Sequence, residues 1–268
     1  MPILTSPVGC LLRDWRRRRR LSQLDLATQV DVSARHLSFV ETGRARPSRE
    51  MVLRLAEHLR VPLRERNLLL NAAGFAADYS ERTLVHPALD VVRSAIDRVL
   101  AGHEPLPAFA VDRHWILVAS NGGFRPYLGD IDPDLLRPPV NVLRLTLHPR
   151  GLGQRLANFQ QWRSHVLSKL HGQILASGDP VLVDLHRELQ TYPVPPEGNA
   201  APPEAEDWHR LVVPFQLVTS SGILSFYSTT TIFGTPLDVT LSEISLECFY
   251  PADAATAKTL RSDPLPPR

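Results

Sequence analysis

The chain of 268 residues is long enough for two globular domains, and its net charge is only +2. Its two cysteines, Cys10 and Cys248, fall in different predicted domains, which argues against a disulfide framework and against a metal site. The charge is divided unevenly, because residues 1–75 contain 14 arginines, no lysine and 7 acidic residues, which leaves +7 there and −5 on the rest. A basic N-terminal segment followed by an acidic remainder is expected of a DNA-binding domain attached to a domain that does not bind DNA.

The sequence contains no predicted secretory or membrane segment. The arginines at positions 16–20 come too early for a secretory signal. Residues 211–237 carry no charge, but serines, threonines, prolines and glycines interrupt them, so alternating strands explain them better than a membrane span. We therefore expect a cytoplasmic protein without membrane insertion.

Residues 21–43 read as two short capped helices with a tight turn between them. Ser22 is the predicted N-cap of the first, with Asp25 completing a capping box, and Ser33 is the predicted N-cap of the second. Asp31 tolerates the left-handed turn conformation, and Gly43 follows the last helical turn. The apolar face of the first helix is predicted to consist of Leu24, Leu26, Ala27 and Val30.

This pattern predicts a helix-turn-helix. Apolar residues at helical spacing predict one helix before it, around Trp15, and two after it, beginning near Ser48 and ending at Gly74. The segment from Leu21 to Gly43, with its Arg-rich flanks, resembles the phage-repressor and Xre class of helix-turn-helix proteins. An ordinary helical hairpin is the alternative. We expect a five-helix DNA-binding domain over residues 1–75.

The second helix of such a motif lies in the major groove of double-stranded DNA. Arg35 is the strongest candidate for reading a base, because a guanidinium can bind guanine through two hydrogen bonds. Ala34, His36 and Ser38 are further candidates on the same helix. Contacts to phosphates are expected from Gln23, Ser33, Arg44 and Arg46, and from Arg17 and Arg18 in the arginine run, although some of that run could simply be the solvated end of a helix.

Residues 76–87 form a polar linker, and a helix over residues 88–101 could connect the domains or mediate dimerisation. A β-hairpin follows, with strands at 109–111 and 115–119 and Asn121 at the start of the next helix. This opening resembles a PAS-type sensor domain.

The remaining elements complete a PAS-like antiparallel sheet. A long helix is predicted from Leu152 to about Ala176, and a shorter one from Val181 to Leu189. Alternating apolar residues predict strands at 211–217, 224–230 and 244–250. Together with the hairpin they give five strands with helices on one side, an α+β domain over residues 88–257 behind the all-α head. Residues 258–268 are expected to be a frayed tail.

Three segments, 141–152, 224–241 and 247–253, resemble the ligand-binding domain of MmyB-like regulators. That family places a PAS-like domain behind an Xre-type head, the order found here. The resemblance implies that the domain holds an apolar small molecule, with fatty acid as the precedent.

Such a site needs apolar walls and one or two polar anchors. His148, Asn158, Arg163 and His165 are the candidate anchors for a carboxylate, although His148, before a proline, could merely end a strand. For any one aromatic residue, a purely structural place in the core is the alternative. The candidate walls are Phe109, Trp115, Phe124, Phe159, Trp162, Phe215, Phe226 and Phe249.

These features predict a DNA-binding transcription regulator that acts as a homodimer and senses a ligand. The sequence contains no nucleophile elbow, no Gly-rich phosphate loop and no paired-histidine metal motif, so we expect neither catalysis nor a cofactor nor a metal. A second hypothesis makes the C-terminal domain a protein-interaction module, which an exposed apolar surface in place of a cavity would favour.

Overall fold

The computed structural model describes residues 7–195 and 212–262. The chain folds into two compact units. One contains the segment up to Thr83 together with Leu175–Ser177 and Thr235–Ser242, and the other contains the remainder. Each unit has its own hydrophobic core.

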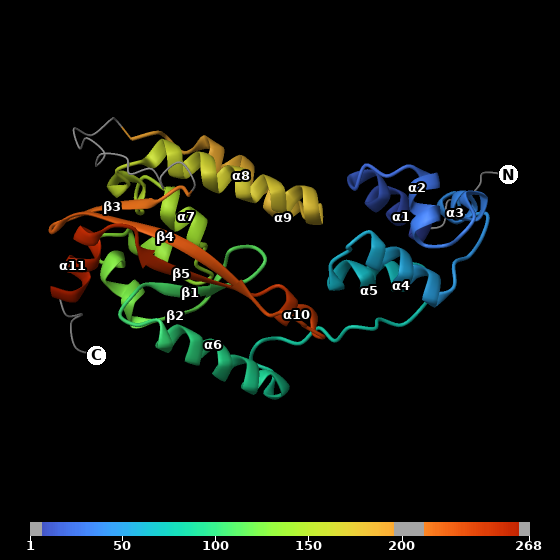
Figure 1. Cartoon of the computed structure of the whole chain (residues 1–268), viewed down its shortest axis with the longest axis horizontal. Coiled ribbons are helices and arrows are strands. Elements are labelled where there is room, and N and C mark those ends of the chain that lie inside the picture. The colour runs from blue at the N-terminus through green and yellow to red at the C-terminus, as the bar shows by residue number, and fades with distance from the viewer. Residues whose placement is uncertain (1–6, 196–211, 263–268) are drawn as a thin grey trace. The chain divides into compact units, whose positions relative to one another are not determined.

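The first unit contains the five predicted helices (Figure 1). They are α1 (Pro7–Arg18), α2 (Gln23–Gln29), α3 (Ala34–Glu41), α4 (Arg49–His58) and α5 (Leu63–Ala72). Leucines, valines and Trp15 pack at their centre. The short helices α2 and α3 form the helix-turn-helix.

The caps predicted from the sequence are confirmed. Ser22 Oγ accepts from the backbone N–H of Asp25, and the Asp25 carboxylate accepts from the N–H of Ser22, both at 3.0 Å. Ser33 Oγ accepts from the N–H of His36 at 3.1 Å. Asp31 and Gly43 adopt left-handed conformations, with φ of 53° and 74°. The caps satisfy backbone groups that have no partner within the helix, and this fixes where α2 and α3 begin.

One residue of the predicted apolar face of α2 is not buried. Leu26, Ala27 and Val30 are buried, but Leu24 is 66% exposed. In a helix of only seven residues the buried stripe is narrow. Leu24 lies outside that stripe.

The second unit is built on a five-stranded antiparallel sheet, as predicted. Its strand order is β2-β1-β5-β4-β3. The turn at 220–222 joins the β3–β4 hairpin. Leu211, placed in the third strand from the sequence, lies outside the described residues. The strands are β1 (Ala108–Val111), β2 (Leu117–Ser120), β3 (Phe215–Thr219), β4 (Gly222–Ile232) and β5 (Ser245–Pro251).

Helices lie on both faces of this sheet, so the expectation of helices on one side is wrong (Figure 1). Helix α6 (Asp90–Gly102) packs against one face, where Ala108 and Ala110 point. Phe109 and Val111 point to the other face, toward α7 (Val142–Leu147), α8 (Phe159–Ser177) and α9 (Pro180–Thr191). Short elements complete the fold: 3₁₀ turns η1 (Pro87–Leu89), η2 (Gly122–Leu128), η3 (Pro133–Leu136) and η4 (Gly153–Arg155), and helices α10 (Val239–Ser242) and α11 (Ala254–Ser262).

Three details of the expected layout are corrected. The segment ending at His148 is a helix, because the Asn141 side chain accepts from the N–H groups of Leu143 and Arg144 and caps α7. The long helix begins only at Phe159, because Leu156 first pairs with Leu217 of the sheet. Residues 258–262 are helical as the end of α11, whereas 263–268 lie outside the described residues.

Candidate functional site

The outer face of α3 carries two cationic side chains beside an aromatic ring. Arg35 is exposed, and its Cζ lies 5.4 Å from the centre of the Phe39 ring one turn further on. Arg44, exposed in the following loop, approaches the same ring at 5.9 Å. Phe39 therefore supports both guanidinium groups while their hydrogen-bond donors remain free to face outward.

The other predicted DNA-contacting residues differ in exposure, and some of them already form hydrogen bonds within the protein. His36, Arg46, Arg17 and Arg18 are exposed, and Ala34 and Ser38 are half-buried. The hydroxyl of Ser33 is engaged in the cap of α3. The amide of Gln23 donates to Glu41 at 2.8 Å, so this side chain also helps to hold α2 against α3.

The arginine run divides into structural and exposed members. Arg16 is buried and donates two hydrogen bonds to Glu41, at 2.7 and 2.8 Å. These bonds raise the pKa of the Arg16 guanidinium. Arg19 donates to the carbonyl of Leu59 at 2.8 Å. Only the neighbours at positions 17, 18 and 20 are exposed, so the run offers fewer free charges than its sequence suggests.

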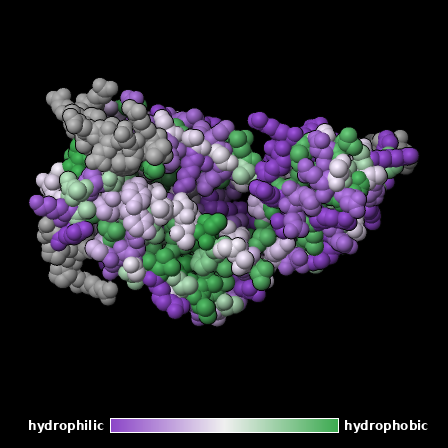
Figure 2. Space-filling model, in the orientation of Figure 1, coloured by the Kyte–Doolittle hydropathy of each residue, from purple (hydrophilic) through white to green (hydrophobic). Residues whose placement is uncertain are grey.

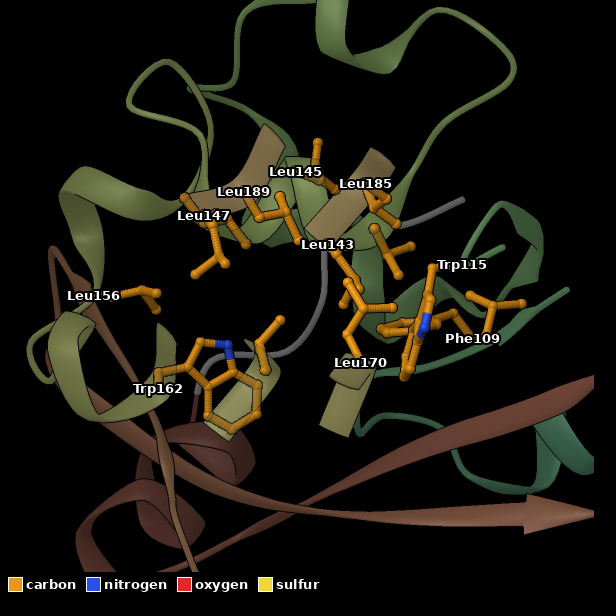
Figure 3. Packing of buried hydrophobic residues seen from close by; sticks show 14 of the residues in the cluster. Phe109, Trp115, Leu143, Leu145, Leu147, Leu156, Trp162, Leu170, Leu185 and Leu189 are labelled. Carbon is orange, nitrogen blue, oxygen red and sulfur yellow. The ribbon is translucent and has the colours of Figure 1, made fainter. Parts of the chain in front are cut away.

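In the second unit a cavity lies between the sheet and helices α7 and α8. It has an empty volume of about 870 Å³, which includes space open to solvent. Aromatic and aliphatic side chains dominate its wall. Figure 3 labels several of them, among them Phe109, Trp115 and Trp162, within the buried hydrophobic cluster. An apolar cavity with a few polar groups is the usual form of a small-molecule site.

Most of the predicted wall residues line this cavity. They are Phe109, Trp115, Phe124, Trp162, Phe215, Phe226 and Phe249, together with the candidate anchor His165. Phe159 is buried in the same hydrophobic cluster without lining the cavity.

Three of the four candidate anchors are also absent from the cavity wall. Asn158 donates to the carbonyl of Pro214 at 2.9 Å, and Arg163 donates to that of Gln190 at 2.6 Å. The His148 ring packs edge-on against Tyr192, with 5.0 Å between ring centres. These polar side chains hold loops and helix ends in place.

Sequence reasoning missed the charged pair in the cavity wall. Lys169 Nζ lies 2.9 Å from Glu247 Oε1, and the Glu247 side chain is only 5% exposed. Thr230 donates to the same oxygen at 2.8 Å, because Thr230 and Glu247 are opposite each other in the β4–β5 ladder. Lys169 lies seven residues after Trp162 on α8, a helical spacing that could have indicated it.

Two further features concern polar groups of residues in the cavity wall. Trp115 has a φ of 65°, an uncommon conformation for a bulky residue, and its indole donates to Gln173 at 2.8 Å. Burial lowers the pKa of His165, and the charge of Lys169 lowers it further. The lowered pKa favours the neutral form of the imidazole.

Two further properties of the described residues bear on the class of protein. No group of three or more His, Cys, Asp or Glu side chains there could hold a metal ion. None of the helices in this part of the chain is long and apolar enough to cross a membrane.

Comparison with known families found two matches, one in each part of the chain. The MmyB-like transcription regulator ligand binding domain matches residues 92–262, and a helix-turn-helix domain matches residues 7–69. The chain belongs to the MmyB-like transcription regulators. The order of the two matches, a helix-turn-helix domain followed by a ligand-binding domain, is the order that the sequence resemblance implied for this MmyB-like chain. Both matched families are regulatory.

Other comparisons add little to the MmyB-like assignment. No curated protein matches the chain. Among solved structures, that of an RNA-binding light-oxygen-voltage receptor aligns with 97% of this chain at 12% identity, with a TM-score of 0.25. The chain spans 62% of that receptor. A TM-score this low does not establish a shared fold.

Proposed function

We propose that this MmyB-like regulator reads a specific DNA sequence through α3 and senses an apolar small molecule in its second unit. The observation that carries the proposal is the cavity, whose wall is mostly aromatic and aliphatic. A closed apolar core would fill such space with side chains. A fatty acid, the precedent from the family resemblance, has the apolar chain that this wall would bind.

For DNA, we propose that Arg35 binds a base edge and that His36 and Ser38 read or exclude neighbouring bases. Arg17, Arg18, Arg44 and Arg46 would neutralise phosphates. Binding to the chromosome fits a cytoplasmic location.

We further propose that the protein acts as a homodimer, which would bring two recognition helices to two half-sites. Helix α6 supports this, because Val91 is 75% exposed and Val99 is 46% exposed. Hydrophobic surface gathers over α6 in the space-filling view (Figure 2). Sedimentation of Val91→Glu against the unchanged protein tests the idea: the charge should shift the protein toward monomer, and an unchanged dimer would place the interface elsewhere.

Native mass spectrometry of the purified full chain tests the ligand proposal. We expect an additional mass of a few hundred daltons that is lost after extraction into organic solvent. If the extracted protein binds no acyl-chain compound, the sensor hypothesis is wrong and the second unit is better explained as a protein-interaction module.

A further inference from the structure

The charged groups of the cavity wall cancel each other. Among the described residues that line the cavity, only Lys169 and Glu247 have a formal charge, and their side chains are paired at 2.9 Å. Lys169 also lies 4.8 Å from the centre of the Trp115 ring, which holds the ammonium group against the wall. The described part of the cavity wall therefore has no positive charge without a partner.

A carboxylate would be poorly accommodated here. To reach Lys169 it would have to leave water and approach the carboxylate of Glu247, which is 5% exposed and accepts from Thr230 as well. Two carboxylates that share one cation in a desolvated site repel each other. His165 offers little compensation, since burial lowers its pKa and so favours the uncharged ring.

In contrast to the paired charges, one indole N–H in the wall has no partner within the described structure. Trp162 is 8% exposed and lines the cavity, and its buried indole Nε1 has no hydrogen-bond acceptor among residues 7–195 and 212–262. In Figure 3 its ring nitrogen faces the interior of the cluster. The indole of Trp115, in the same wall, instead donates to Gln173. A buried N–H without an acceptor is costly, and an oxygen atom of a ligand would remove that cost.

We propose that the ligand is an uncharged acyl-chain compound, such as an amide, ester, ketone or alcohol, whose oxygen accepts a hydrogen bond from Trp162 Nε1. Glu247 disfavours the free carboxylate. The neutral ring of His165, whose centre lies 5.3 Å from that of Trp162, can donate to or accept from the same polar group. This inference rests on the proposed sensing of an apolar molecule and specifies its head group.

The first test compares two head groups on one chain. The full-length protein, extracted free of lipid, is titrated calorimetrically with myristamide and with myristate at mildly alkaline pH, below their aggregation concentrations. We expect the amide to bind about tenfold more tightly, the effect of one good hydrogen bond. The variant Glu247→Gln, which leaves Lys169 with its charge unpaired, should gain affinity for myristate and not for the amide.

The second test isolates the Trp162 donor. Trp162→Phe should weaken binding of myristamide by about tenfold. Trp115→Phe removes an indole N–H from the same wall, but one that already has an acceptor, so it should weaken amide binding less than Trp162→Phe does. Thermal unfolding of each variant checks that the fold is retained.

The two tests distinguish failure of the head-group proposal from failure of the sensor proposal. Tighter binding of myristate than of myristamide, or equal effects of Trp162→Phe and Trp115→Phe on amide binding, would overturn the uncharged head group and leave the sensor proposal intact. Absence of binding by both compounds and by the corresponding methyl ester would overturn both proposals.

Discussion

Glu41 of α3 accepts two hydrogen bonds from Arg16 of α1, 25 residues earlier in the chain. The amide of Gln23 at the start of α2 donates to the same carboxylate. Arg16 also donates to the carbonyl of Leu21 in the connection between α1 and α2. One buried carboxylate therefore holds three helices in the arrangement that presents α3.

Removal of this carboxylate should destabilise the first unit. Glu41→Ala leaves the Arg16 charge without a partner, because the Glu41 side chain is 1% exposed and that of Arg16 10%. Loss of one member of a buried ion pair costs about 3–5 kcal/mol. Urea unfolding followed by far-UV circular dichroism reports the change. Arg16→Met combined with Glu41→Leu should recover part of the loss, and a double variant less stable than Glu41→Ala would argue against this explanation.

Arg35 and Arg17 should affect DNA binding in different ways. Arg35→Ala is expected to cost about 1–3 kcal/mol on a specific site and little on unrelated DNA, because it removes a base contact. Arg17→Ala should weaken both and reduce the salt dependence, as loss of a phosphate contact does. Fluorescence anisotropy at several salt concentrations measures the affinity for each DNA and its salt dependence. If Arg35→Ala leaves the ratio of specific to non-specific affinity unchanged, this arginine does not read a base.

Gly9 sets the distance between α1 and α3. A Cβ at this position would lie 2.3 Å from the carbonyl oxygen of Val40, which is backbone and cannot rotate away. Gly9→Ala should therefore destabilise the first unit by about 1–3 kcal/mol through overpacking. Gly102→Ala is the control, because a Cβ there has no heavy atom within 4 Å. Equal melting temperatures for both variants would show that α1 and α3 can move apart without cost.

An ion pair that joins α7 to α9 should make stability depend on pH. Arg144 donates to both Glu188 oxygens, at 2.8 and 2.7 Å, and these bonds lower the pKa of Glu188. Because the folded-state pKa is depressed, the stabilisation is present above the unfolded pKa of about 4.3 and is lost as pH falls through the folded value.

The pair is partly exposed, so its contribution is about 1 kcal/mol or less. Urea unfolding of the unchanged protein and of Glu188→Gln at neutral and acidic pH measures it. The stability advantage of the unchanged protein should shrink in acid. If the difference in unfolding free energy between the two proteins is the same at neutral and acidic pH, the ionised Glu188 does not contribute to stability.

Local signals made the first unit predictable. Ser22, Asp25, Ser33 and Gly43 act within one or two turns of their own position, so the sequence contains the whole interaction. The role of Arg16 was not predictable, because its partner lies 25 residues away and an arginine within a basic run has no local sign of burial.

The cavity was predictable in its aromatic wall and not in its polar groups. Phe109, Phe215 and Phe226 lie on strands whose alternation assigns them one face of the sheet. Lys169 and Glu247 meet only because α8 packs over β5, a contact 78 residues apart in sequence. The alternating leucines of 143–147 mimic a strand, and the cap from Asn141 makes them a helix.

The central claim, that occupancy of the cavity controls DNA binding, is tested most directly by one comparison. The affinity of the full-length protein for an operator selected from genomic fragments is measured after lipid extraction and again with the cavity saturated by an acyl-chain ligand. A ligand that regulates must bind the two states of the protein with different affinity, so we predict a change in the operator dissociation constant of about fivefold or more. An identical constant with the cavity empty and full would contradict the account.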